Sequence, residues 1–206
     1  MTREQFASRL LNACASVMAA EQELTEIDSK FGDADHGLTM AKIARAITEA
    51  VEDAGGIQTM LDDAAMAVMS LNGGSAVPLW NTWLDGLQEE APEGEEIDVP
   101  GIQTIFAKAL EELNEMSGAK VGDKTMMDAL IPASEAVASY SGADEAGLFA
   151  AAAQAAAAGA ENSKNFVSKF GRVKSYGAQT IGTPDAGAMS MAYFFRGLAQ
   201  DSSESN

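Results

Sequence analysis

Residues 28–56 read DSKFGDADHGLTMAKIARAITEAVEDAGG. The second half of this stretch repeats apolar residues at helical spacing, on the stripe Met40, Ile43, Ile47 and Val51. The first half gathers three aspartates and the only histidine of the chain, at Asp28, Asp33, Asp35 and His36. Carboxylates this close repel one another unless a cation or a proton offsets their charge, and Mg²⁺ prefers oxygen ligands. The stretch therefore predicts a helix whose start carries a metal site.

The same periodicity runs through the rest of the chain and predicts eight helices. Their approximate spans are 2–27, 38–54, 57–71, 78–87, 102–117, 124–140, 144–170 and 185–198. Thr2 and Gln5 have the spacing of a capping box at the first helix start. Pro132 should kink the sixth helix, because proline cannot donate a backbone hydrogen bond. The alanine-rich seventh helix indicates close approach to its neighbours, unless the alanines reflect helix propensity alone.

The fold class predicted is all-α, because no segment shows the sustained alternation of a β-strand. Short loops favour a bundle or barrel of eight antiparallel, up-and-down helices. One domain should cover residues 1–200, with a disordered tail over 201–206. In this topology the acidic loop 88–100 lies at one end of the bundle. The loops after odd-numbered helices meet at the other end, at 28–37, 72–77, 118–123 and 171–187.

The chain has 206 residues and a net charge of −18. A nucleic-acid partner needs clustered basic residues, so this charge argues against one; its plainest effect is solubility. Cys14 is the only cysteine, so neither an intrachain disulfide nor an all-cysteine metal site is available. The N-terminus lacks the apolar core of a signal peptide, and no apolar run could span a bilayer. We expect a cytoplasmic protein with no nucleic-acid or membrane partner.

Other interpretations of the acidic stretch fit less well. An EF-hand fails because the glycine comes one residue early and Ala44 stands where a bidentate glutamate belongs. One histidine without a nearby cysteine does not favour zinc. An aspartate-rich turn that only caps the following helix remains the alternative. The common phosphate-binding sequences, Walker A and GxGxxG, are absent from the chain.

Glycine-containing helix starts recur in the loops of the same end. The N–H groups from His36 to Thr39 could face phosphate oxygens, and so could the turn before Ser75 and Ala76. Ordinary helix capping is the alternative in both places.

Two further loops carry charged residues. Gly122 precedes Lys124, one of few cations near this end, for which a solvated surface position is equally open. Arg172 could pair with a phosphate. Asp185 either caps the last helix or holds a ribose hydroxyl, and capping is the more common role.

Several of these motifs together resemble one known family. GDADHG at 32–37, GDKTMMDALIPA at 122–133, GR at 171–172 and IG followed by D-x-GA over 181–188 are similar to the ADP-binding L subunit of dihydroxyacetone kinase. In this family the same fold forms the nucleotide domain of single-chain dihydroxyacetone kinases and related triose or tetrose kinases. The resemblance covers about residues 5–200. It implies a barrel of eight antiparallel helices with the nucleotide at one end.

The resemblance also implies site residues and partners. Two Mg²⁺ ions would be held by Asp28, Asp33 and Asp35. ADP or ATP would be bound by His36, Gly37, Leu38, Thr39, Ser75, Ala76, Gly122, Ile131, Arg172, Asp185, Ala186 and Gly187. A small hydroxyketone would sit on a separate K subunit, and the phosphoryl donor is either ATP or a phosphotransferase-system protein. A homodimer is left open.

Two loops depart from the family pattern. Ser75 is displaced by one residue, and Val77 replaces a glycine. A valine takes a positive φ only at a high cost, so we predict a shifted phosphate loop. Lys174, Gln179 and Ala186 stand where the family usually has Ser, Arg and Pro. We predict a divergent kinase subunit. The alternatives are a nucleotide-loaded regulatory module that contacts a transcription factor, and a metal-binding or purely structural helical bundle.

Overall fold

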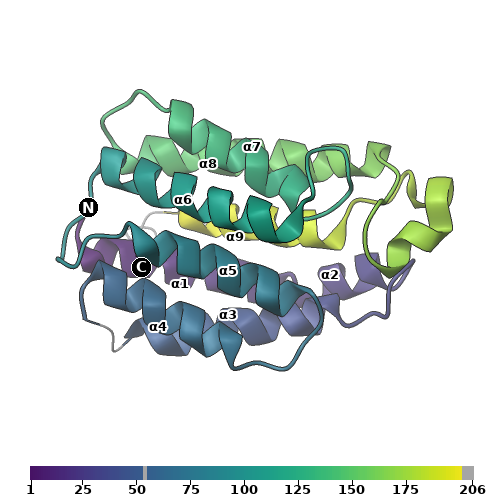
Figure 1. Cartoon of the computed structure of the whole chain (residues 1–206), viewed down its shortest axis with the longest axis horizontal. Helices are drawn as coiled ribbons and strands as arrows, with labels where there is room; N and C mark the ends of the chain where they lie inside the picture. Colours follow the sequence, from purple (N-terminus) through teal and green to yellow (C-terminus); the bar gives the residue numbers. More distant parts are fainter. Residues whose placement is uncertain (53–54, 201–206) are drawn as a thin grey trace.

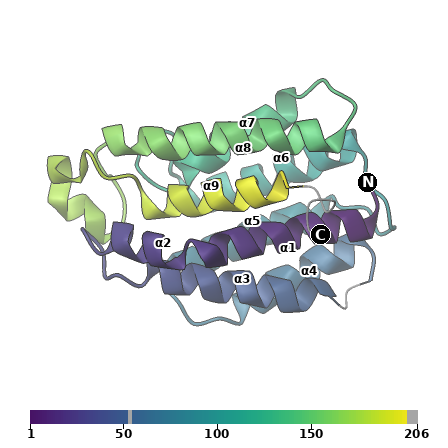
Figure 2. The same cartoon turned by 180° about the vertical axis from the view of Figure 1, so that it is seen from behind.

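The computed structural model describes residues 1–52 and 55–200, and the expected tail 201–206 lies outside the described residues. Within them, eight helices run up and down around a closed ring in chain order (Figures 1 and 2). They are α1 (Arg3–Ala19), α3 (His36–Glu52), α4 (Ile57–Met69), α5 (Ala76–Glu89), α6 (Val99–Ser117), α7 (Met127–Ser139), α8 (Glu145–Asn162) and α9 (Ala186–Leu198). Each packs against the next, and α9 returns to α1. The predicted all-α fold is confirmed.

One more helix in the described part, α2 (Glu21–Asp28), extends the chain beyond the end of α1 and packs against α3 and α9. The prediction of one continuous helix over 2–27 was wrong, because the chain bends at Ala20, where φ is −92° and ψ is 4°. No glycine or proline marks this position. The sequence pattern alone therefore could not reveal the bend, which lets α2 pack against two neighbours.

Four of the helix starts in the described residues follow local capping signals. The capping box of Thr2 and Gln5 is present at α1. Asp98, Asp144 and Asp185 each accept a backbone hydrogen bond at the starts of α6, α8 and α9. These caps satisfy N–H groups that have no partner inside the helix.

Two predicted helix boundaries were wrong, the start of α7 and the end of α8, and Lys124 contacts the chain at both places. α7 begins at Met127 rather than near residue 124, because Lys124 has a left-handed φ of 61°. α8 ends at Asn162 rather than near residue 170. The Lys124 ammonium donates hydrogen bonds to the carbonyls of Ser163 and Thr183, at 2.7 and 2.5 Å. The chain then continues through the short 3₁₀ helices η1 (Ser163–Asn165) and η2 (Arg172–Thr180).

The contact between α7 and α8 depends on small residues. α7 continues through Pro132, which leaves the carbonyl of Asp128 without its helical donor. α8 passes close to this carbonyl: a Cβ added to Gly159 would lie 2.0 Å from its oxygen. On the same helix the side chains of Ala152, Ala156 and Ala160 are buried. The predicted close approach of the alanine-rich helix is confirmed.

Aromatic side chains fill the middle of the ring. Trp80 and Trp83 of α5 contact Phe106 of α6 and Phe194 of α9 edge to face. The ring centroids lie between 5.1 and 6.0 Å apart, and all four side chains are buried. This geometry is favourable for aromatic pairs. The packed centre leaves the ends of the barrel for ligands.

The two ends differ as the helix order predicted. Four loops lie at the end that carries α2 and η2 (Figure 1), and residues from all four line one cavity. These are the loops 28–37, 72–77, 118–123 and 171–187. At the opposite end, the N-terminus pairs with the acidic loop: Arg3 N–H donates to the Glu95 carbonyl at 2.7 Å, and Ile97 N–H donates to the Met1 carbonyl at 3.0 Å. None of the helices in the described residues is long and apolar enough to cross a membrane.

Candidate metal and ligand site

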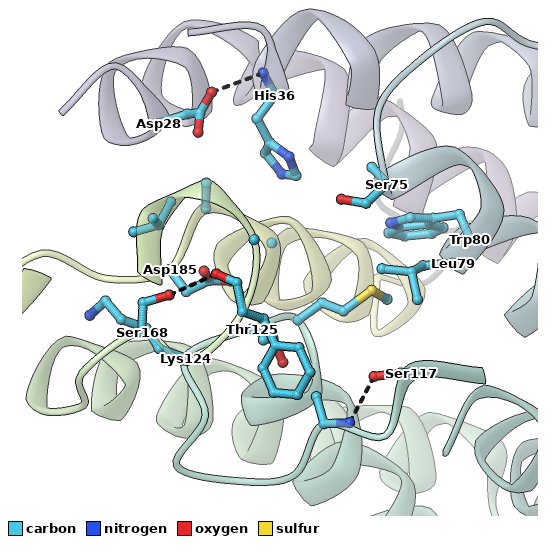
Figure 3. A pocket seen from close by; sticks show the side chains of 18 of the residues that line it. Asp28, His36, Ser75, Leu79, Trp80, Ser117, Lys124, Thr125, Ser168 and Asp185 are labelled. Carbon is cyan, nitrogen blue, oxygen red and sulfur yellow. Dashed lines mark hydrogen bonds between the residues drawn. The ribbon is translucent and has the colours of Figure 1, made fainter. Parts of the chain in front are cut away.

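A cavity of about 410 Å³ opens where the four loops meet (Figure 3). This volume lies in the range of small-molecule sites. Its polar lining includes Asp28, His36, Lys124, Thr125 and Asp185. Its apolar lining includes Pro78, Leu79, Trp80, Met116, Met126, Phe170 and Val173. The cavity therefore suits a ligand with both a charged part and an apolar part.

The three aspartates predicted to bind metal lie together. Asp28, Asp33 and Asp35 each offer a carboxylate oxygen within 4.8 Å of the other two. Asp28 Oδ2 also accepts hydrogen bonds from the N–H groups of Asp35 and His36, at 3.2 and 3.4 Å. Ala34 has a φ of 61°, a conformation that non-glycine residues adopt at a cost. Asp28 therefore caps the start of α3 and also belongs to the cluster, while metal binding by the three aspartates stays a prediction.

The two glycines of GDADHG are required by close contacts. A Cβ added to Gly32 would lie 1.9 Å from Asp28 Oδ1, so only glycine leaves room for this carboxylate. A Cβ added to Gly37 would lie 2.1 Å from the Glu21 carbonyl, where α2 and α3 meet. Gly37 was predicted to face phosphate. Its main structural role is the contact between these two helices.

Other groups of the protein offset the negative charge of the aspartate cluster only in part. Loss of hydration and the negative charges of Asp33 and Asp28 raise the pKa of the Asp35 carboxyl. Arg172, in the α8–α9 segment (residues 163–185), pairs with Asp33 at 2.7 Å, but their side chains are 65% and 40% exposed. Exposed pairs of this kind are weak. Three adjacent carboxylates that still repel one another fit a hard divalent cation such as Mg²⁺.

His36 begins α3 and projects into the cavity across from Thr125 and Asp185 (Figure 3). Its Nε2 lies 2.6 Å from Ser190 Oγ of α9. Burial lowers the pKa of the imidazole, although the charge of Asp28 opposes this shift. The neutral ring is thereby favoured.

Buried charges hold the loop on the opposite side of the cavity. Asp128 is fully buried and accepts hydrogen bonds from Gly122 N–H at 2.6 Å and Thr125 N–H at 2.7 Å. The sequence left open whether Lys124 lies at the site or on the solvated surface. The residue is only 4% exposed, so it does not lie on the surface. Burial lowers the pKa of its ammonium. Lys124 and Thr125 reach the cavity from a rigidly held loop.

Asp185 lies between the cavity and α9. Its Oδ2 accepts a hydrogen bond from Ala188 N–H at 2.8 Å, which confirms the capping role. Burial raises the pKa of its carboxyl to about 7. A carboxyl with this pKa can either accept or donate a hydrogen bond near neutral pH.

The structure divides the predicted nucleotide residues into two groups. Those that line the cavity are His36, Ser75, Ala76, Asp185, Ala186 and Gly187. Those outside its lining are Gly37, Leu38, Thr39, Gly122, Ile131 and Arg172. Thr39 is buried, and its N–H already donates to the Asp35 carbonyl at 2.9 Å. Val77, for which we predicted a shifted loop, lies inside α5 and does not have a positive φ. Binding by these residues stays a prediction.

Sequence reasoning missed the apolar side of the cavity. Leu79, Trp80 and Met116 fall within the helices predicted over 78–87 and 102–117, and no role at the site was predicted for them. In the structure all three line the cavity, together with Phe170 from the α8–α9 segment. Their positions near helix ends beside the glycine-containing loops were the available signal.

The fold and the site define a class of protein: an antiparallel helical barrel with a cavity at one end, beside a cluster of three aspartates. The chain belongs to the DAK2 domain family, whose model matches residues 30–200. This confirms the resemblance found in the sequence.

The chain is similar to D-erythrulose kinase from Mycolicibacterium smegmatis, with 33% identity over 95% of this chain and 35% of that protein. It is 27% identical to the ADP-binding subunit DhaL of the PEP-dependent dihydroxyacetone kinase 2 from Listeria innocua, over 90% of this chain and 88% of that one. The crystal structure of the dihydroxyacetone kinase from C. freundii in complex with AMP-PNP and Mg²⁺ matches with a TM-score of 0.71 and 26% identity, over 94% of this chain and 33% of that chain. The chain spans about a third of the length of the first curated relatives it matches.

Proposed function

We propose that this chain is the nucleotide-binding module of a dihydroxyacetone-type kinase. It binds ADP or ATP with two Mg²⁺ ions at the acidic end and passes a phosphoryl group to a small hydroxyketone. A K-type partner, either a separate subunit or another domain of a longer polypeptide, holds the hydroxyketone. One observation carries the proposal: the cluster of three carboxylates shares Asp28 with a cavity that His36 also lines and whose other side is apolar.

The relatives support both parts of this proposal, nucleotide binding and phosphoryl transfer. The Listeria relative is an ADP-binding subunit of nearly the same length, and the C. freundii kinase with the same fold was solved with AMP-PNP and Mg²⁺. The Listeria kinase is PEP-dependent, whereas the Mycolicibacterium relative is named only as a kinase. The immediate phosphoryl donor of this chain is therefore open between ATP and a PEP-dependent phosphotransferase protein.

The residues of the chain contribute by positioning. Asp28, Asp33 and Asp35 would hold Mg²⁺, which when bound supplies positive charge against the phosphate groups. Asp28 orients the acidic loop through its two backbone hydrogen bonds. The Asp128 carboxylate fixes the facing loop, from which Thr125 reaches the cavity. The apolar lining gives the flat ring of a nucleobase a contact surface and excludes water from it.

A second function, nucleotide binding for regulation without turnover, is favoured by one observation. Arg172, for which the sequence suggested a contact with phosphate, pairs with the Asp33 carboxylate. Lys174 and Gln179 of the same segment also differ from the family pattern. A regulatory module would keep the aspartates and tolerate these changes.

Turnover separates the two functions. The purified chain with Mg²⁺–ATP should not phosphorylate dihydroxyacetone, glyceraldehyde or erythrulose by itself. Addition of a K-type subunit should produce turnover of at least one of them. Activity of the isolated chain at about 1 s⁻¹ or faster would contradict the need for a partner. Tight nucleotide binding without turnover in the presence of K-type subunits would favour the regulatory function.

A further inference from the structure

Ser190 of α9 lies behind His36 and is fully buried. Its Oγ lies 2.6 Å from His36 Nε2 and 2.9 Å from the carbonyl oxygen of Ala186. Neither the family motifs in the sequence nor the predicted site includes this serine. The three residues join the start of α3 to the first turn of α9, where Ala186 and Gly187 line the cavity.

The hydroxyl of Ser190 has one proton to donate. In a helix, a serine hydroxyl commonly donates to the carbonyl four residues earlier, which here is Ala186. With the hydroxyl proton directed to Ala186, the lone pairs of Oγ remain for His36, and the 2.6 Å contact is then a hydrogen bond that Nε2–H donates. Nδ1 is left unprotonated in the neutral ring, as the nitrogen available to a ligand.

We propose that Ser190 is a positioning residue that holds His36 as the Nε2–H tautomer and directs Nδ1 to the ligand in the cavity. This inference rests on the proposed nucleotide function of the cavity. The ligand group that meets Nδ1 should be a hydrogen-bond donor, such as a hydroxyl or a water molecule held by the ligand. Without Ser190 the imidazole can rotate or exchange tautomers. Only a fraction of the molecules then has the ring orientation and tautomer that contact the ligand.

His36 is the only histidine of the chain, so its tautomer can be read without assignment. A long-range ¹H–¹⁵N correlation spectrum of the protein, prepared without a histidine tag, should show the Nε2–H form at about pH 8, where imidazole is neutral. The measurement uses the nucleotide-free wild-type chain. An Nδ1–H form, or a rapidly exchanging mixture of tautomers, would overturn the proposal.

The role in binding is tested with Ser190→Ala against Ser134→Ala. Ser134 is a matched control because it is also buried, in α7, and its Oγ has no hydrogen-bond partner in the described structure. Ser190→Ala should exchange tautomers and bind Mg²⁺–ADP about 3- to 10-fold more weakly, the range expected for the loss of one hydrogen bond. Ser134→Ala should keep the wild-type spectrum and affinity.

The outcomes distinguish this inference from the proposed function. Equal affinity and an unchanged tautomer in Ser190→Ala would overturn the positioning role and leave nucleotide binding intact. If wild-type protein does not bind Mg²⁺–ADP, the proposed function fails, and with it the role of Ser190 toward that ligand. If Ser190→Ala does not fold, the wild-type spectrum still decides whether Ser190 holds the proposed tautomer.

Discussion

Asp35 is the residue at which the chemistry of the acidic end is easiest to isolate. Its carboxylate belongs to the cluster, whereas Asp28 also caps α3 and Asp33 pairs with Arg172. Loss of hydration and the neighbouring charges raise the pKa of Asp35, which shows that the folded chain disfavours its ionised form without a cation. A substitution here tests the metal site with little effect on the surrounding loop.

We expect Asp35→Asn to weaken Mg²⁺–ADP binding, because the amide is a poorer ligand for a hard cation and carries no charge. Isothermal titration calorimetry measures the affinity. Asp85→Asn is the control, since Asp85 is exposed on α5 and the substitution removes the same charge outside the cluster. Equal affinities for Asp35→Asn and wild type would argue against the cluster as a metal site.

At the scale of elements, the cavity depends on where α8 ends and on how the α8–α9 segment is held beside the loop before α7. Ser163 is fully buried, and its carbonyl accepts the Lys124 ammonium while its hydroxyl accepts the Asp185 N–H at 2.8 Å. Gly182 N–H donates to the Lys164 carbonyl at 2.7 Å. These bonds hold both ends of the segment beside the loop before α7. The segment can then bring Phe170 to the cavity and Arg172 to the acidic cluster.

Lys124→Met should loosen this arrangement. It removes two hydrogen bonds and leaves the buried carbonyl of Ser163 without that donor, which should lower the unfolding free energy by about 1–3 kcal/mol. Urea denaturation measures the loss. Hydrogen exchange should quicken over residues 163–183 more than in α5. The control is Lys120→Met, because Lys120 is exposed in the same loop. Similar effects of the two substitutions would rule out Lys124 as the tie between the loops.

At the scale of the whole molecule, ligand binding and folding should be coupled. A chain with a net charge of −18 concentrates three carboxylates at one end, and their repulsion is present only in the folded state at this distance. Metal and nucleotide together should relieve this repulsion. Neither ligand alone supplies both the cation and the phosphate groups.

Thermal unfolding tests this coupling. At a concentration near 100 times its dissociation constant, a ligand that binds only the folded state stabilises it by about 2.7 kcal/mol. Differential scanning fluorimetry should show a large rise in melting temperature with Mg²⁺ and ADP together, and small rises with either alone. A full rise with ADP alone would show that the nucleotide binds without the metal, contrary to the proposed site.

Local sequence patterns determined most of the fold. Helical stripes, caps such as Thr2 and a stop such as Gly118 are read over a few neighbouring residues, so the all-α class and the order of the helices could be predicted. Helix order also predicted that four loops share one end. GDADHG and the preceding Asp28 identified the acidic cluster, because the spacing of these carboxylates is itself local. The same motif together with those at 122–133, 171–172 and 181–188 identified the family.

Only the tertiary structure decided which partners these residues have. Three features depend on residues that lie in different loops or helices. They are the burial of Lys124, the close approach of Asp28 to Gly32, and the contact of Ser190 with His36. No glycine or proline stands at the bend at Ala20 or directly after the end of α8, and both features depend instead on packing and on bonds from other segments. Propensity and periodicity describe one segment at a time, whereas burial, hydrogen bonding and pKa depend on what the completed fold places beside each group.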